Sequence, residues 1–284
     1  MKKHDKIDER PTPPRGQLNP GRDGVQLHRI PLPAGDLLRH IWFAVWDLDK
    51  PILQPVLEHP GGNVVIEPDR AALYCVSRGT SEQKLQGKGW AAAVLLRPAA
   101  ITVMTGRSMD PRSWSGPALP IGSPLPIPGV GNLVDQVREV MSAEDRESAD
   151  RYRTVADLYQ EWGRQWSIDE EGALINRVVD LIEEDDGPRR VTDLAAAVSL
   201  STRALQRVVL HRTGLSPKWL IQRRRLQDAA LALRWGDTTI ADVAAGLGYS
   251  DQAHLAREFK AVIGLTPSDY LRDSAPLRGE SAEG

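Results

Sequence analysis

Few side chains in this 284-residue sequence could support covalent or metal chemistry, and they are His40, Glu58, His59 and Cys75. No pair among them has the His-x-His or His-x3-His spacing that would place two metal ligands on one element. His59 lies in the turn EHPGG and is expected at the surface, whereas Cys75, in the strand-like LYCVS, is expected to be a buried apolar side chain. We therefore predict no catalytic residue, no metal site and no cofactor.

A second group of side chains could form hydrogen bonds with nucleic acid. Most are Arg or Gln, which can make bidentate contacts with guanine and adenine edges in the major groove. They lie on the outward faces of two predicted helices, Arg203, Gln206 and Arg207 on the first and Gln252, His254, Arg257 and Lys260 on the second. Arg and Gln on an exposed helix face often contact only solvent. Whether these side chains contact DNA must therefore be judged from the structural units to which the two helices belong.

Both predicted helices belong to a repeat in the C-terminal third of the chain. VTDLAAAVSLS (191–201) aligns with IADVAAGLGYS (240–250), and LQRVVLHRTGLSP (205–217) aligns with LAREFKAVIGLTP (255–267). Each copy reads as a short helix, a turn, a longer helix and then Gly, Leu, Ser or Thr, and Pro. Repeats indicate duplicated supersecondary units, and this pattern predicts two helix-turn-helix units.

The turn and cap residues of the repeat agree with this interpretation. Gly248 can adopt a positive φ in the turn of the second copy. Ser201 and Ser250 are predicted to cap the longer helices, with backbone N–H groups left for a phosphate. Gly214 and Gly264 are predicted to end those helices.

The segment between the copies, residues 217–235, reads as one helix of roughly 28 Å at 1.5 Å per residue. That length could place two recognition helices about 34 Å apart, which is one turn of DNA. Residues 188–273 contain 13 Lys/Arg and 8 Asp/Glu, a net charge of +5, although the whole chain has a net charge of −2. The acidic segment EEDDG (183–187) is not expected to face DNA, because phosphates would repel it.

The second copy, AGLGYSDQAHLAREFKAVIGLTPSDYLR, resembles the signature of AraC/XylS-type transcriptional regulators, and residues 171–272 resemble their DNA-binding domain. The resemblance implies an all-α domain of two helix-turn-helix lobes joined by a long helix. By position it implies base readout by Arg203, Gln206 and Arg207 in the first lobe and by Gln252, Ala253, His254 and Arg257 in the second. The candidate phosphate contacts are Ser201, Thr202, Lys218 and Lys260. Because alanine cannot hydrogen-bond a base edge, the second lobe is predicted to read little sequence.

The N-terminal half has a different pattern. Six short apolar runs, separated by Pro, Gly, Asp and Asn, predict an antiparallel barrel or sandwich. The runs are HIWFAVWDL, ILQPVLE, NVVIEP, AALYCVS, QKLQGKG and WAAAVLLRP. Helices are predicted from about residue 131, over about 143–166, and after Ser167, which stands in a capping-box arrangement with Glu170.

The N-terminal half also resembles that of a group of AraC-type regulators whose N-terminal domain has no assigned ligand. The resemblance lies in the segments HIWFAVWDL, HPGGNVVIE and LRP. This resemblance implies a cupin-like β domain followed by helices. The fold class is therefore predicted to be α+β, with a β-rich domain, following helices and an all-α C-terminal domain. The predicted segments are a disordered tail (1–26), a β-rich sensor domain (27–125), a helical connector that could dimerise (126–167), an AraC-type DNA-binding domain (168–273) and a disordered tail (274–284).

Aromatic side chains suggest where an effector could bind. Trp42 and Trp46 share a face of a predicted strand and, with Trp90, could line a pocket or simply fill the core. Arg97, at a strand end, could pair with an anionic effector or lie at the surface. A further pair, Trp162 and Trp166, lies four residues apart on a predicted helix, where it is expected to pack in the core or else to join domains or subunits.

The expected function is sequence-specific DNA binding by a transcription regulator under the control of a small-molecule effector or a partner. Implied partners are double-stranded promoter DNA, RNA polymerase and a second copy of the chain. One alternative is an enzyme, such as a DNA repair protein, that borrows this DNA-binding module; another is a regulator whose N-terminal domain only dimerises. The sequence has no apolar run of about 18 residues and no signal peptide pattern, so a cytoplasmic protein without membrane contact is expected.

Overall fold

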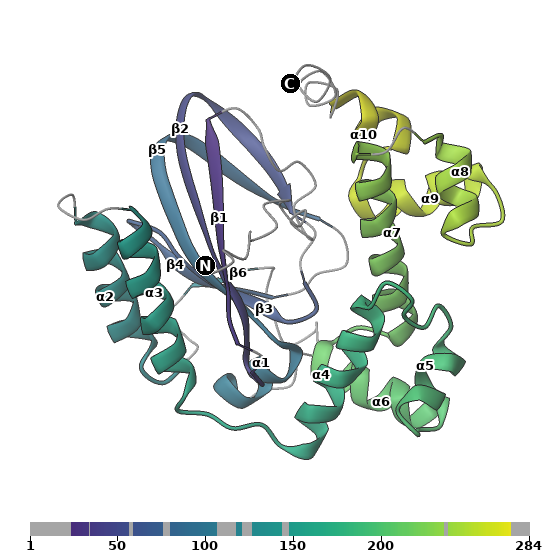
Figure 1. The fold of residues 1–284 in the computed structure, drawn as a ribbon, viewed down its shortest axis with the longest axis horizontal. Coiled ribbons are helices and arrows are strands. Elements are labelled where there is room, and N and C mark those ends of the chain that lie inside the picture. The colour runs from purple at the N-terminus through teal and green to yellow at the C-terminus, as the bar shows by residue number, and fades with distance from the viewer. Residues whose placement is uncertain are drawn as a thin grey trace, which may run out of the picture.

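The computed structural model describes residues 24–33, 35–56, 59–75, 80–106, 118–120, 127–143, 148–235 and 238–273. Glu58, the C-terminal tail and all but the last few residues of the predicted N-terminal tail lie outside this description. The described chain forms an antiparallel sheet with flanking helices, followed by a helical region (Figure 1). The predicted α+β class and the order of its parts are therefore confirmed.

The N-terminal region contains one antiparallel sheet with the strand order β1-β2-β5-β3-β4-β6. Its strands are β1 (Val25–Pro31), β2 (Leu38–Val56), β3 (Gly62–Ile66), β4 (Ala71–Cys75), β5 (Ser81–Leu96) and β6 (Ala118–Pro120). In the described residues the sheet is continuous and has β1 and β6 at its edges. We call this sheet, with the helices that follow it up to residue 163, the sheet domain.

Four strands differ from the sequence prediction, and one of them is β6, which was not predicted. β2 unites two predicted runs, because an irregularity between Leu48 and Ile52 lets its pairing with β5 continue past Pro51. β5 likewise unites two runs, and Gly87, inside the first of them, has a positive φ of 58°. β1 was not predicted, and it begins at Val25, inside the segment assigned to the tail.

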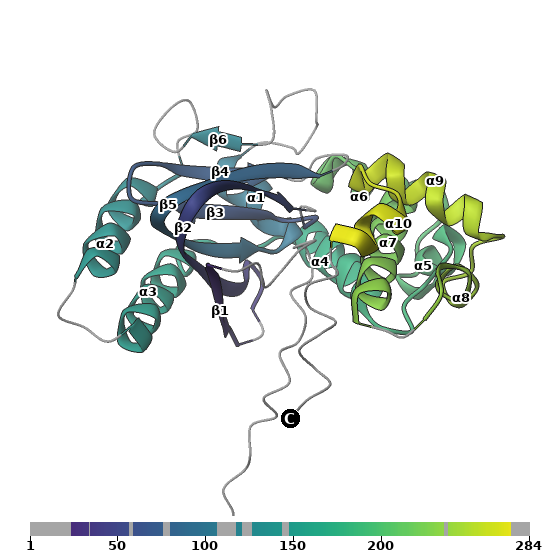
Figure 2. The same cartoon turned by 90° about the horizontal axis from the view of Figure 1, so that it is seen from above.

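Helices cover one face of the sheet. They are α1 (Pro98–Thr105), α2 (Val130–Ser142) and α3 (Ser148–Gly163), of which α1 was not predicted. Alternate residues of β2, Ile41 and Phe43, point into the core between sheet and helices, and both are fully buried. Tyr159 of α3 is buried in the same core, where its hydroxyl donates to the carbonyl of Ala92 at 2.9 Å. Helices α2 and α3 lie side by side against the sheet (Figure 2).

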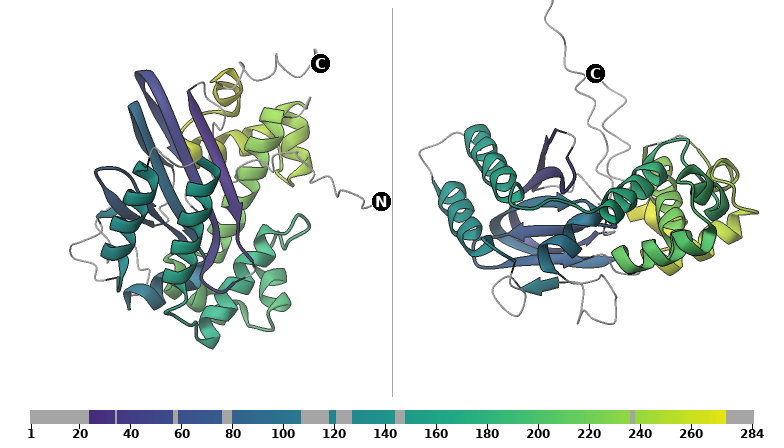
Figure 3. Two further views of the ribbon diagram at one scale, coloured as in Figure 1. Left: turned by 60° about the vertical axis from the view of Figure 1, so that its left-hand side comes forward. Right: turned by 90° about the horizontal axis from the view of Figure 1, so that it is seen from below.

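The helical domain comprises α4 (Glu170–Glu183), α5 (Val191–Ala197), α6 (Thr202–Thr213), α7 (Pro217–Trp235), α8 (Ile240–Gly246), α9 (Gln252–Ile263) and α10 (Pro267–Asp273). Helices α4, α5 and α6 form a first lobe with the start of α7, and α8, α9 and α10 form a second lobe with its C-terminal half. The predicted pair of lobes joined by a long helix is confirmed. This domain lies across the sheet from α2 and α3 (Figures 1 and 3).

Two predicted helix caps were wrong by one or two residues. The N-cap of α4 is Asp169, whose carboxylate accepts from the Gly172 amide at 2.8 Å, rather than Ser167. The N-cap of α9 is Asp251, which accepts from His254 at 2.7 Å, rather than Ser250. Aspartate is as good a cap as serine, so neighbouring Ser and Asp residues leave the register ambiguous in the sequence.

Candidate nucleic-acid interface

The helix-turn-helix geometry is present in both lobes. The turn between α5 and α6 contains Ser199 at φ 56°, and the turn between α8 and α9 contains Gly248 at φ 73°. The second helix of each pair ends at a glycine with a left-handed conformation, Gly214 and Gly264. The sequence predicted Gly248 and both terminal glycines, and these predictions are confirmed.

Helix α6 separates a buried face from an exposed one. Leu205 and Val209 are fully buried in the first lobe. The three predicted base-reading residues are on the opposite, exposed face, Arg203, Gln206 and Arg207. At the N-terminus, the Ser201 hydroxyl accepts from the Ala204 amide at 3.2 Å, which confirms its predicted capping role. Of the other candidate phosphate contacts near this helix, Thr202 is half-buried and Lys218 is exposed.

Helix α9 presents a smaller set of polar side chains. Leu255 and Phe259 are fully buried. The exposed candidates are Gln252, Ala253, Arg257 and Lys260. Among them only Gln252 and Arg257 carry groups suited to bidentate contact with a base edge.

His254 is held by its own helix and turn. Its Nδ1 atom lies 3.2 Å from the Ser250 hydroxyl, and its Nε2 atom lies 3.4 Å from a Glu258 carboxylate oxygen. The imidazole also makes an edge-to-face contact with Tyr249, with ring centroids 5.2 Å apart. The structure therefore places this predicted base reader among intramolecular partners on the flank of α9.

The Arg223–Arg224–Arg225 triplet of α7 serves the fold. Arg223 is 1% exposed and donates to Gln227 at 3.2 Å. Arg224 donates to the Glu183 carbonyl at 2.9 Å and pairs with two carboxylates. Arg225 donates to the Leu247 carbonyl, and its guanidinium lies 4.0 Å from the centre of the Tyr249 ring. Much of the positive charge that the sequence assigns to the helical domain is thus used in holding its parts together.

The tryptophans of the sheet domain are divided between two faces. Trp42 and Trp46 share the face opposite α2 and α3, as predicted, where Trp42 Nε1 donates to Asn63 Oδ1 at 3.0 Å. Trp46 lies over Gly89, so closely that a Cβ atom there would be 2.6 Å from its ring. Trp90 packs instead against the core beneath α2 and α3. The structure therefore brings two of the three candidate tryptophans together.

Arg97 lies where the two domains meet. Its guanidinium, 18% exposed, forms an ion pair with Asp180 of α4. The candidate anion-binding residue thus already has an anionic partner within the chain.

Of the candidates for metal or covalent chemistry, the structure describes His40, His59 and Cys75. No group of three or more His, Cys, Asp or Glu side chains suited to a metal occurs among the described residues. Cys75 is buried, as expected. His59, expected at the surface, is only 8% exposed, so that prediction was wrong. Burial and then the charge of Arg39 hold the pKa of His59 well below its usual value.

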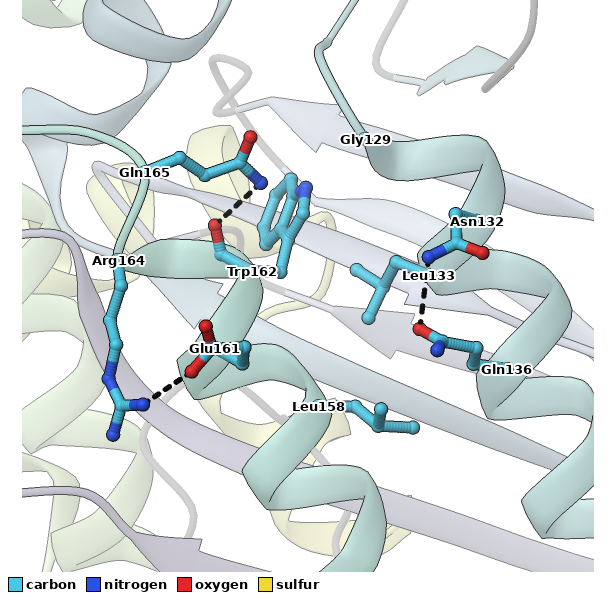
Figure 4. Close-up of a pocket in the computed structure, with 9 residues that line it drawn as sticks. All are labelled: Gly129, Asn132, Leu133, Gln136, Leu158, Glu161, Trp162, Arg164 and Gln165. Carbon is cyan, nitrogen blue, oxygen red and sulfur yellow. Dashed lines mark hydrogen bonds and ion pairs between the residues drawn. The ribbon is translucent and has the colours of Figure 1, made fainter.

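The end of α3 packs against α2 beside a groove of about 480 Å³ (Figure 4). Trp162 is buried there and donates from Nε1 to the Pro128 carbonyl at 3.1 Å. Trp166 meets it edge to face, with ring centroids 5.0 Å apart. The aromatic pair predicted from the sequence therefore closes the core of the sheet domain at this end.

These features define a class: a sheet domain followed by two helix-turn-helix lobes with polar recognition helices. Comparison with known proteins agrees. Residues 194–273 match the family described as "Helix-turn-helix domain", and residues 33–111 match a family described as "Domain of unknown function (DUF6597)". The helical domain belongs to the AraC/XylS type of helix-turn-helix domain. No helix in the described part of the chain is long and apolar enough to cross a membrane.

The relatives are transcription regulators by name. The regulator MtrA of Neisseria gonorrhoeae is 28% identical over 108 residues, which are 38% of this chain and 35% of that protein. A putative AraC-like transcription regulator of Streptomyces lividans is 35% identical over 82 residues, 29% of this chain and 27% of that protein. The matched part of the chain thus spans about a third or less of these curated relatives. The structure of ToxT from Vibrio cholerae aligns with 88% of this chain and 98% of the ToxT chain. The sequence identity is 13% and the TM-score is 0.41, so the similarity is weak.

Proposed function

We propose that the chain is a transcription regulator that binds promoter DNA with α6 and α9 in two successive major grooves. The observation that carries the proposal is the exposed row Arg203, Gln206 and Arg207 on the second helix of a helix-turn-helix lobe. In such lobes this helix enters the major groove. Arg and Gln there can discriminate bases through paired hydrogen bonds.

The two lobes contribute unequally in this proposal. Helix α6 supplies three side chains that can read bases, whereas α9 supplies Gln252 and Arg257. Ala253 can contact only a thymine methyl group. Contacts with DNA phosphates are proposed to orient the helices on the duplex. The residues that would make them lie at or near the ends of the recognition helices and are Ser201, Thr202, Lys218 and Lys260.

The sheet domain is proposed to bind a small-molecule effector or a partner that changes DNA affinity or contact with RNA polymerase. The face with Trp42 and Trp46 supports this, because aromatic rings beside polar groups such as Asn63 suit a planar ligand. Helices α2 and α3 are a proposed surface for a homodimer. The predicted domain boundaries at residues 125, 167 and 273 belong to the same proposal, whereas β1 places the start of the sheet domain before residue 26.

The alternative of an enzyme that borrows this domain finds less support. Its nucleophile would be Cys75, a buried thiol. The relatives above are named as regulators, consistent with a protein that is not an enzyme. A regulator whose sheet domain only dimerises remains a second candidate; sedimentation of the full chain with and without metabolite extracts distinguishes it, since dimerisation alone requires no ligand.

The test is enrichment of genomic fragments by the full-length protein at a stated salt concentration. The comparison is an Arg207→Ala/Arg257→Ala double variant, with Lys50→Ala as a control, because Lys50 is an exposed basic residue of β2, outside the helical domain. We expect a few promoter fragments to be enriched by the wild type and the control but not by the double variant. Equal enrichment by all three proteins would contradict the proposed interface.

A further inference from the structure

One face of α4 is directed at the sheet domain. Asn176 donates to the Asp36 carbonyl at 2.7 Å and accepts from the Ala99 amide at 3.1 Å. Asp180, four residues later, pairs with Arg97 of the sheet domain. Glu183 follows three residues after Asp180, so all three polar side chains share one helical stripe. Helix α4 therefore forms a polar seam between the two domains, beside α1 (Figure 1).

Glu183 ends this stripe inside a cluster of cationic and imidazole groups. Its carboxylate is 6% exposed and lies 3.4 Å from Arg39 Nη2 and 3.6 Å from His59 Nε2, both in the sheet domain. Its Oε1 atom also lies 3.6 Å from Arg223 Nη1 in α7. One buried carboxylate thus faces a residue pair from the sheet domain and an arginine from the helix that joins the two lobes.

The sheet-domain side of this cluster is held in place. The Gly61 amide donates to His59 Nδ1 at 3.2 Å, and Arg39 Nη1 lies 2.8 Å from His59 Nε2. Burial and the neighbouring arginines hold the pKa of His59 low, so the ring is uncharged and carries a single proton. Because Nδ1 accepts from the Gly61 amide, that proton lies on Nε2, which faces Glu183 Oε1 at 3.6 Å. The charge that attracts Glu183 across the domain boundary is therefore that of Arg39, which lies against the imidazole.

On the side of the helical domain, the cluster around Glu183 is connected to both lobes through neighbouring arginines of α7. Arg223 is buried in α7, and Arg225, two residues later, is bound to Leu247 and Tyr249 of the second lobe. Arg224, between them, is bound to the end of α4. A displacement of Glu183 would therefore act on the one helical turn that fixes α4, α7 and the second lobe relative to each other.

We propose that Glu183 is the positioning residue through which the sheet domain and the DNA-binding lobes respond to each other, by way of Arg39 on one side and Arg223 on the other. The inference rests on the proposed function, since it concerns how DNA binding is coupled to the sheet domain. Coupling between two sites is reciprocal in binding free energy. DNA bound to the lobes must therefore affect the sheet domain near Arg39 and His59, and no effector is needed to detect it.

The experiment is hydrogen exchange of the full-length protein with and without an enriched promoter fragment. The readout is the exchange rate of amides in residues 59–66, which include Gly61 and β3. The main variant is Arg39→Gln, because Arg39 is 27% exposed and its replacement leaves Glu183 beside Arg223. Glu183→Gln is a second variant, although it leaves Arg223 buried without its carboxylate and could destabilise the fold. The matched controls are Lys50→Gln, at an exposed residue of β2, and Asp185→Asn, which removes an 87% exposed partner of Arg224.

In the wild type and both controls, DNA is expected to slow exchange of residues 59–66 by about fivefold or more, the lower end of typical coupling. In Arg39→Gln the slowing is expected to fall below about twofold while DNA is still bound. Exchange that does not respond to DNA in the wild type, or that still responds in Arg39→Gln, would overturn the inference while the proposed function stands. A wild type that binds no fragment would overturn the proposed function and this inference together.

Discussion

Ser199 and Gly248 occupy equivalent positions in the two helix-turn-helix units, and both have a left-handed backbone, with φ of 56° and 73°. In each case the following residue returns an amide hydrogen bond to the preceding helix, Leu200 to Ala195 and Tyr249 to Ala244, both at 2.9 Å. Ser199 is the one non-glycine residue with positive φ in the described chain. The turn therefore requires this conformation whichever residue occupies it.

The matched exchange Ser199→Gly and Gly248→Ser should change stability in opposite directions. Ser199→Gly removes the steric cost of a left-handed serine and should stabilise the helical domain by roughly 0.5–1 kcal/mol. Gly248→Ser should destabilise it by about the same amount, since a Cβ at Gly248 would meet no atom within 4 Å and only the backbone cost remains. Urea unfolding of the full-length variants measures both, and a loss of stability in Ser199→Gly would contradict the argument.

Gln206 and His254 are expected to differ in their effect on DNA specificity. Gln206 is exposed on α6, whereas His254 is bound to Ser250 and Glu258. Gln206→Ala should relax the preference at one base pair by about 1–3 kcal/mol. His254→Ala should weaken binding of all sequences alike, because it removes support for α9.

Selection from random duplexes at fixed salt measures this difference. The enriched sequences of the wild type and of each variant are compared position by position. Lys218→Ala is the control for a phosphate contact, which should weaken binding without changing the selected bases. A new base preference in His254→Ala would show that the imidazole leaves its partners and reads DNA.

The helical domain was predictable because its signals are local. The repeat, the glycines that end α6 and α9, and the apolar spacing of Leu205 and Val209 all lie within one unit of the chain. The sequence predicted antiparallel strands but not which strands pair, since pairing between β2 and β5 or between β3 and β5 joins residues far apart in sequence. Nothing in a single run reveals that β5 takes a central place in the sheet.

The residues that join the domains were missed for a related reason. His59 follows Arg39 by 20 residues, and Glu183 follows His59 by 124 residues. Only the fold brings the three side chains together. One sequence feature pointed in this direction. The acidic segment EEDDG was not expected to face DNA, and its first residue, Glu183, contacts the sheet domain. Arg223 is one of the 13 Lys/Arg residues that give the helical domain its net positive charge, yet it is among the most buried large side chains of the described chain.

Gly89 is expected to control the position of Trp46. A Cβ at Gly89 would lie 2.6 Å from the indole, so Gly89→Ala must displace the ring or bend β5. The expected cost is about 1–3 kcal/mol of unfolding free energy, with altered tryptophan fluorescence. Gly131→Ala is the control, because its Cβ would meet nothing within 4 Å and the change should be neutral or slightly stabilising in α2. Unchanged stability and emission in Gly89→Ala would contradict the packing described for this face.

The stability of the protein should decrease as the pH falls from about 6.5 to about 4. Burial, followed by the charges of Arg29 and Arg39, lowers the pKa of His40 from 6.5 to about 4, and His59 is shifted in the same direction. Between the two pKa values the unfolded chain binds more protons than the folded one, so lowering the pH favours unfolding. Each such histidine can contribute a slope of no more than about 1.4 kcal/mol per pH unit.

Urea unfolding at several pH values measures this slope in the wild type and in His40→Gln. The variant cannot titrate at residue 40, so its stability should depend less steeply on pH across the same window. His211→Gln is the control, because His211 is an exposed residue of α6, far in sequence from the sheet. An identical slope in the wild type and His40→Gln would mean that the pKa of His40 is the same in the folded and the unfolded protein, against the lowering expected from burial, Arg29 and Arg39.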